Sequence, residues 1–260
     1  MKNDKPIEKH PAAEKTPYTV SWFSAGVSSA VATKLAIADI DEIIYTHIDD
    51  QHPDTMRFVK DCEAWFGKAI TVLQSPAKSV EGALRLAGGV KFTHGAPCTN
   101  TLKRRIRKEW ESEHADYDLV YIWGMDATET ERLDRLRVSM PKQQHRCPLI
   151  EQRIGKAEAH EILKASGIKR PAMYDLGYHN NNCVGCVKGG LGYWNKIRVD
   201  FPEVFASRAK MEREIGASIL STRDTPRKPL YLDDLDPQAG RHDGPIVDDC
   251  GIMCELMRME

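Results

Sequence analysis

The sequence has little that would draw the chain to a membrane or a polyanion. No apolar run approaches the roughly 20 residues that a bilayer-spanning helix needs. The first residues, Met1 to Pro6, lack an apolar core, so we expect no secretory signal and a cytoplasmic location. The formal net charge of −1 gives no overall attraction to nucleic acid or lipid. These absences exclude a membrane-spanning protein and favour a soluble one. Any attraction to a polyanion would have to come from a local basic patch rather than from the net charge.

The expected reducing compartment also decides how the seven cysteines are interpreted. Disulfides are rare there, so metal ligands, reactive thiols and core residues are the expected uses. The chain of 260 residues suits one large α/β domain, or one domain with an appendage.

Strand-like and helix-like segments alternate through the first half of the chain. Predicted strands are 18–23, 42–48, 69–73 and 119–123, and predicted helices are 28–38, 53–65, 80–87 and 102–113. The alternation predicts an α/β fold, a Rossmann-like and mostly parallel sheet flanked by helices.

The pattern changes after about Cys147, where a cysteine-rich and loop-rich C-terminal extension begins. Helices are predicted over 156–166 and 205–215, with an Asn-, Gly- and Cys-rich loop over 180–192. The predicted organisation is a flexible tail (1–17), a nucleotide-binding domain (18–150), a cysteine-rich region continuing it (151–224), and a C-terminal arm (225–260).

A loop of small residues connects the first predicted strand to the first predicted helix. Its sequence is Ser24-Ala25-Gly26-Val27-Ser28-Ser29. Small side chains let backbone N–H groups close around a phosphate, and the dipole of the following helix favours its negative charge. The loop therefore predicts a nucleotide site that uses all six residues. The alternative is a tight strand–helix turn with small residues for packing.

Polar residues follow two other predicted strands at their carboxyl ends. Asp49 and Asp50 follow the second strand, and Gly124, Glu129 and Arg132 follow the fourth. Ligands of open parallel sheets bind outside this edge, so these residues are predicted to join the nucleotide site. Gly124 permits close approach, Glu129 suits ordering of the site, and Arg132 suits pairing with phosphate. The alternative for Glu129 and Arg132 is an i,i+3 pair on a solvated helix face.

The order of these motifs resembles the phosphoadenosine phosphosulfate (PAPS) reductase family of the PP-loop adenine-nucleotide hydrolases. The loop stands where that family has Ser-Gly-Gly-x-Asp-Ser, with Ala25 replacing a glycine and Ser28 replacing the acidic residue. Further similar segments are 48–55, 124–129 and 147–150. The resemblance implies a site for ATP, or for PAPS or its non-phosphorylated relative APS, with Mg²⁺ offsetting the phosphate charge.

Three cysteines form a second pattern. Cys183 and Cys186 are a C-x-x-C pair, and Cys98 lies 85 residues before Cys183. Such a pair chelates one metal centre or acts as a redox dithiol. The iron–sulfur branch of sulfonucleotide reductases has Cys-Cys-x-x-Arg-Lys at the first position. This chain keeps Cys98 and Lys103, and Thr99 replaces the second cysteine. The resemblance therefore implies a three-cysteine 4Fe–4S cluster with one open iron. A zinc site and unligated cysteines are the alternatives.

The C-terminal sequence favours a different reaction. Asp249-Cys250-Gly251-Ile252-Met253 resembles the Glu-Cys-Gly-Ile/Leu-His tail that carries the nucleophilic thiol of PAPS-type reductases. Asp249 replaces the family's Glu and Met253 replaces its His, and the alternatives are a cysteine that carries a persulfide and a fortuitous match. Cys250 or Cys254 is also a candidate fourth cluster ligand. Cys62 is expected in the core, and Cys147 is expected to be structural.

Together the motifs predict an ATP-dependent enzyme of sulfur transfer. It would adenylylate a tRNA or DNA acceptor and insert sulfur from a 4Fe–4S cluster, with Asp49, Lys103 and Cys250 as catalytic residues. A cysteine desulfurase as sulfur donor and a homodimer are further expected partners. The basic cluster 103–108, together with Trp194, Lys196 and Arg198, suits contacts with phosphate and bases. The alternatives are a solvated helix face for the basic cluster and a packing role for Trp194. One alternative is a sulfonucleotide reductase with Cys250 as nucleophile, and another is a non-catalytic nucleotide- and metal-binding accessory protein.

Overall fold

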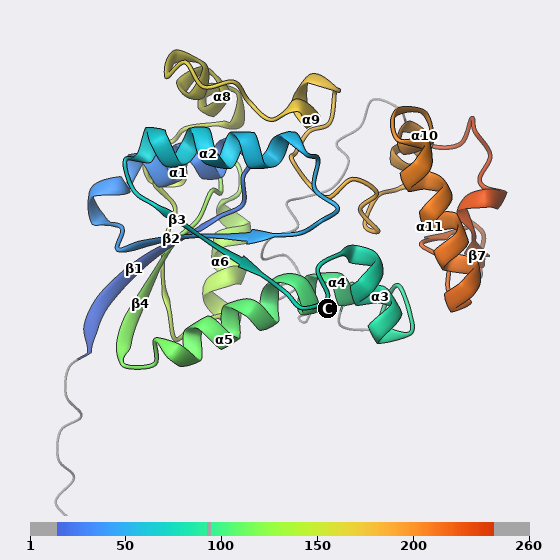
Figure 1. Cartoon of the computed structure of the whole chain (residues 1–260), viewed down its shortest axis with the longest axis horizontal. Helices are drawn as coiled ribbons and strands as arrows, with labels where there is room; N and C mark the ends of the chain where they lie inside the picture. The colour runs from blue at the N-terminus through green and yellow to red at the C-terminus, as the bar shows by residue number, and fades with distance from the viewer. Residues whose placement is uncertain (1–14, 93–94, 242–260) are drawn as a thin grey trace, which may run out of the picture.

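The computed structural model describes residues 15–92 and 95–241 and has a five-stranded parallel sheet at its centre (Figure 1). The strand order is β3-β2-β1-β4-β5. The strands are β1 (Thr16–Phe23), β2 (Glu42–His47), β3 (Ile70–Gln74), β4 (Tyr117–Ile122) and β5 (Gln144–Arg146). Every neighbouring pair is parallel, which confirms the predicted Rossmann-like fold class.

Two strands depart from their predicted bounds. β1 begins at Thr16, because its first residues pair with Tyr117 and Asp118 of β4. It therefore takes in the last two residues of the predicted tail. β5 was not predicted, since its sequence Gln-His-Arg has no apolar alternation and only its pairing with β4 defines it.

Helices cover both faces of the sheet (Figure 1). One face carries α1 (Val27–Leu35), α2 (Asp54–Phe66), α7 (Pro148–Glu151) and α8 (Lys156–Ala165), and its core includes Phe58 and Cys62. The burial of Cys62 confirms the predicted core role and raises the pKa of its thiol. The other face carries α5 (Arg105–Glu113) and α6 (Thr130–Ser139), packed through Trp110 and Leu136.

The predicted basic helix has an irregular start. A short α4 (Pro97–Thr99) runs into a π-helical turn, η2 (Asn100–Arg104), before α5 continues. Cys98 and Leu102 are both buried in this stretch. The 3-10 turn η1 (Ile37–Asp39) lies between α1 and β2 in the chain.

The C-terminal part forms a third packed cluster beside the sheet (Figure 1). Its elements are α9 (Ala172–Asp175), α10 (Leu191–Asp200), α11 (Pro202–Ile215), β6 (Leu220–Ser221), β7 (Pro229–Leu230) and η3 (Leu232–Asp234). The helix α3 (Val80–Ala87), from the first half of the chain, packs into the same cluster. The predicted arm is packed as far as it is described, because Leu232 and Leu235 are buried and Arg213 pairs with Asp233. In the described part of the chain, no helix combines the length and apolarity needed to span a bilayer.

Candidate nucleotide site

The small-residue loop lies at the carboxyl edge of the sheet, between its two halves. β1 is the middle strand, and the chain builds β2 and β3 on one side of it before placing β4 and β5 on the other. The strand order therefore reverses between β1 and β4, which is where open parallel sheets bind their ligands. The loop joins β1 directly to α1, so its amides lie at this switch point.

The loop is held in its shape by its own hydroxyl groups. The Ser29 hydroxyl donates to the Gly26 carbonyl at 3.0 Å and accepts from the Ser24 hydroxyl at 2.9 Å and the Ser24 amide at 3.2 Å. Ala25 has a φ of +57°, a conformation that favours glycine. Ala25 thus adopts the left-handed turn at the position where the related family has glycine.

Gly124 brings the end of β4 against the loop. A Cβ atom at this position would lie 2.5 Å from the Ser29 Cα and 2.6 Å from the Ser29 amide nitrogen. Both neighbours are backbone atoms at the start of α1, so the contact cannot be relieved by a side-chain rotation. The structure therefore places Gly124 beside the loop, where a close approach requires glycine.

Glu129 and Arg132 pair with each other beside this strand end. The Arg132 guanidinium donates to one Glu129 carboxylate oxygen, and the other oxygen accepts from the Asp126 amide at 3.0 Å. Arg132 is 7% exposed, so the i,i+3 pair exists but is not on a solvated face. Glu129 orders the turn after β4, and a contact of Arg132 with phosphate stays a prediction.

The two aspartates after β2 occupy different environments. Asp50 is tied into the fold: its carboxylate pairs with the buried guanidinium of Arg208 and accepts from the Val80 amide at 2.5 Å. Asp49 is half exposed and accepts from the Gln74 side-chain amide at 2.6 Å. The carboxylate of Asp50 therefore connects α3 and α11 to the end of β2. Asp49 is the aspartate whose side chain faces solvent.

The cysteine loop is attached to the same strand end. The Val184 amide donates to the Asp50 carbonyl at 2.8 Å, and Cys183 forms a single β-bridge with Gln51. The Tyr193 hydroxyl accepts from the Cys186 amide at 2.8 Å and donates to the Cys183 carbonyl at 3.3 Å. The C-x-x-C turn is thus fixed to the segment after β2 and to Tyr193 by these contacts of its backbone.

The predicted cluster ligands are only partly brought together. Cys98 and Cys186 are buried in one hydrophobic cluster, and Cys183 packs against it while staying partly exposed. Across residues 15–92 and 95–241, no three His, Cys, Asp or Glu side chains are placed to hold a metal ion. The described residues therefore do not show the predicted three-cysteine ligand set, and the 4Fe–4S cluster and Mg²⁺ stay predictions. Cys250 and Cys254 lie outside the described residues.

Several residues that were predicted to contact a polyanion make contacts within the fold. Trp194 is fully buried in the third cluster, which confirms packing over base stacking. Arg198 donates to the Leu235 carbonyl at 2.8 Å, and Lys196 pairs with Asp200 at 2.7 Å. Lys103 is half-buried in the π-helical turn after Cys98.

The side chain of Cys147 is buried in the core beside β4. It is 1% exposed, and desolvation raises the pKa of its thiol to about 12. A thiol in this state is unreactive, which agrees with the predicted structural role.

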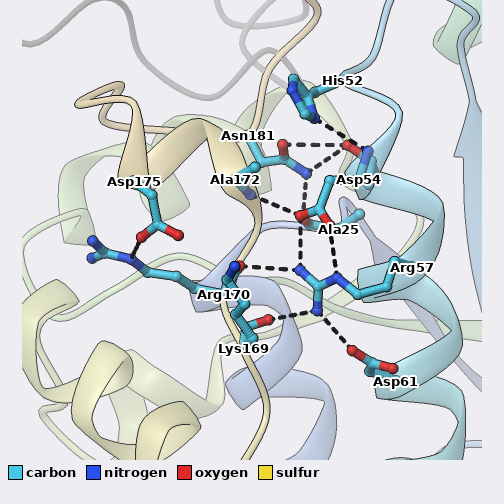
Figure 2. A network of polar contacts seen from close by, with 11 residues as sticks. Ala25, His52, Asp54, Arg57, Asp61, Lys169, Arg170, Ala172, Asp175 and Asn181 are labelled. Carbon is cyan, nitrogen blue, oxygen red and sulfur yellow. Dashed lines mark hydrogen bonds and ion pairs between the residues drawn. The ribbon is translucent and has the colours of Figure 1, made fainter.

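Sequence reasoning missed a segment that covers the loop, residues 169–181. Arg57 of α2 donates to the Lys169 carbonyl at 2.8 Å and to the Arg170 carbonyl at 3.1 Å (Figure 2). Further along, the Asn181 side-chain amide donates to the Ala25 carbonyl at 2.9 Å. Asn181 is 6% exposed, so the loop carbonyl and this amide satisfy each other in a buried position.

Asp54 anchors the same segment at the start of α2. Its carboxylate accepts from Arg57 and from the Ala172 amide at 2.8 Å (Figure 2). The Arg57 hydrogen bond is the main cause that lowers the pKa of Asp54 to about 2. The charged carboxylate therefore holds α2 and the covering segment together.

This contact predicts a loss of stability in acid. Because the folded pKa of Asp54 is depressed, its contribution is present above the ordinary value of 3.8 and is lost as the pH falls toward about 2. We expect the free energy of unfolding to fall more steeply across this window in the wild type than in Asp54→Asn. Urea denaturation above and within the window measures both slopes, and equal slopes would contradict the assignment.

The sequence pattern of the phosphoadenosine phosphosulfate reductase domain matches residues 18–189. Among solved structures, the chain is similar to the phosphoadenylyl-sulfate (PAPS) reductase from Candida auris, crystallised as a phosphate complex. The two are 12% identical with a TM-score of 0.46, and the match covers 67% of this chain and 84% of that one. No curated protein sequence matches the chain.

Proposed function

Because the chain belongs to the phosphoadenosine phosphosulfate reductase domain family, we propose that it reduces an adenine sulfonucleotide and holds the nucleotide phosphate at the loop 24–29. The observation that carries this proposal is the position of the loop. It opens α1 at the point where the strand order reverses, and Gly124 packs against its backbone. The first amides of α1 lack partners within the helix, so they suit a phosphate oxygen.

The proposed reaction uses a thiol from the C-terminal sequence. The Cys250 thiolate attacks the sulfonate sulfur, and the sulfur–oxygen bond to the phosphate breaks. The nucleotide leaves with that electron pair, and Cys250 carries the sulfonate. A thiol of an external dithiol then attacks the Cys250 sulfur, and sulfite leaves with the bonding electrons. The second thiol of the dithiol releases Cys250, so the sulfonate is reduced and the dithiol becomes a disulfide.

The chain's described residues contribute binding to this scheme. Loop amides and the α1 dipole stabilise the phosphate charge that develops as the sulfur–oxygen bond breaks. No step of the proposed reaction passes through a metal ion or an iron–sulfur cluster. ATP-dependent sulfur insertion into tRNA or DNA stays a prediction of the sequence, because no contact among the described residues favours it over sulfonucleotide reduction.

Nucleotide binding should weaken when a larger side chain is placed in the loop. Gly26 begins α1 in an extended conformation, and a Cβ atom there would lie 3.3 Å from the Tyr174 hydroxyl and 3.6 Å from that of Ser24. We expect Gly26→Val to weaken binding of adenosine 3′,5′-bisphosphate by about tenfold or more, since one charge-assisted hydrogen bond contributes about 1.5–3 kcal/mol. Isothermal titration calorimetry measures the change.

The matched control is Gly155→Val. Gly155 begins α8 in a similar extended conformation, and nothing lies within 4 Å of its Cβ position. This variant should bind the nucleotide as the wild type does. Equal affinities of Gly26→Val and Gly155→Val would contradict the loop assignment. Tight binding without sulfite release in the wild type would favour a non-catalytic accessory protein.

A further inference from the structure

A tyrosine hydroxyl accepts a hydrogen bond from one backbone amide of the candidate phosphate site. The Val27 amide, the first of α1, donates to the Tyr174 hydroxyl at 3.2 Å. The same hydroxyl would lie 3.3 Å from a Cβ atom on Gly26. A phosphate bound at the start of α1 would use this amide, and one N–H group cannot make two full-strength hydrogen bonds at once.

The tyrosine is carried by a segment that other residues hold in place. Its ring makes an edge contact with His160 of α8, with ring centroids 4.9 Å apart. The short helix α9 on which it lies is fixed at its start by the Ala172 amide, which donates to Asp54. These contacts fix the position of the Tyr174 hydroxyl through residues that lie outside the loop 24–29.

The same segment also holds the loop on the other side and then continues into the cysteine pair. Asn181 donates to the Ala25 carbonyl, seven residues after Tyr174 in sequence. Cys183 follows two residues later and is partly exposed. Loss of the hydrogen bond between the Val27 amide and Tyr174 therefore affects a segment that reaches Cys183 only nine residues later.

We propose that Tyr174 is a gate of the nucleotide site, whose hydroxyl satisfies the Val27 amide until a phosphate oxygen displaces it and loosens the segment that leads to Cys183. The proposal rests on the proposed function for the location of the phosphate. It adds that the site is closed by a hydrogen bond from its own chain, and that nucleotide occupancy is communicated to the cysteine loop.

The variant Tyr174→Phe tests the gate because it removes the hydroxyl and keeps the ring against His160. If the hydroxyl competes with the phosphate, adenosine 3′,5′-bisphosphate should bind about three- to tenfold more tightly to the variant, the range expected for one neutral hydrogen bond. The control is Tyr121→Phe, which removes a buried hydroxyl that donates to Glu111 on the other face of the sheet and should leave the affinity unchanged.

The second measurement is the alkylation rate of Cys183 by iodoacetamide, followed by peptide mass mapping. We expect saturating nucleotide to speed alkylation in the wild type, and the variant to show the faster rate without nucleotide. A merely structural role of Tyr174 would not make alkylation independent of the nucleotide. Unchanged alkylation on nucleotide binding would overturn the coupling to the cysteine loop.

The outcomes separate the gate from the proposed function. Equal or weaker binding by Tyr174→Phe, with tight binding by the wild type, overturns the gate and leaves the nucleotide site in place. Absence of nucleotide binding by both proteins overturns the site and the gate together. Tighter binding by the variant supports both.

Discussion

Gly124→Ala should lose both stability and nucleotide binding, although it adds a single methyl group. The new Cβ would lie 2.5 Å from the Ser29 Cα, a separation that real Cβ atoms do not show. Either β4 or the start of α1 must move. Overpacking of this kind costs about 1–3 kcal/mol, and about 2–4 °C in melting temperature for each kcal/mol in a chain of this size. Thermal denaturation measures the first effect.

The same substitution displaces the loop amides from the phosphate. A misplacement of about 1 Å can cost on the order of a hundredfold in rate. We therefore expect the rate of sulfite release to fall even at temperatures where the variant is fully folded. The matched control is Gly155→Ala, whose Cβ position has nothing within 4 Å. A Gly124→Ala protein with the melting temperature and affinity of that control would contradict the close approach of β4 to the loop.

Cys250→Ser should abolish sulfite release from PAPS while leaving nucleotide binding intact. The hydroxyl is a far weaker nucleophile than a thiolate, and removing a nucleophile costs on the order of a thousandfold or more in rate. A colorimetric sulfite assay with an excess of a dithiol measures the effect, and calorimetry with adenosine 3′,5′-bisphosphate checks binding.

The comparison variant is Cys254→Ser, which changes the other cysteine of the C-terminal sequence. It should keep the release of one nucleotide per protein in a single turnover, because the first step needs only the Cys250 thiolate. Sulfite release that survives in Cys250→Ser would contradict the assignment of the nucleophile.

The sheet and its loop could be predicted because their signals are local. A strand pattern, a run of small residues and a helix pattern follow one another within Val20 to Ala30, and parallel topology then places the ends of β2 and β4 beside them. The same reasoning could not separate Asp49 from Asp50. Their difference is set by Arg208, which lies 158 residues after Asp50 in the chain.

The contacts that cover the loop are equally remote in sequence. Tyr174 lies 147 residues from Val27, and Asn181 lies 156 residues from Ala25. Tyr174 belongs to no periodic pattern or motif, and the predicted loop 180–192 that contains Asn181 does not indicate a contact with Ala25, so only tertiary packing reveals them. The cysteine spacing predicted Cys98, Cys183 and Cys186 as metal ligands. Cys98 and Cys186 share a hydrophobic cluster, but burial in one cluster is a weaker condition than a ligand geometry.

The product that the wild-type protein makes tests the central claim most directly. The protein is incubated in parallel with PAPS plus a dithiol and with ATP, and sulfite and pyrophosphate are measured in both. The account predicts sulfite from PAPS, lost in Gly26→Val and kept in Gly155→Val, and no pyrophosphate from ATP. Pyrophosphate release from ATP without sulfite release from PAPS would contradict sulfonucleotide reduction. It would favour ATP-dependent sulfur transfer as the function of the chain.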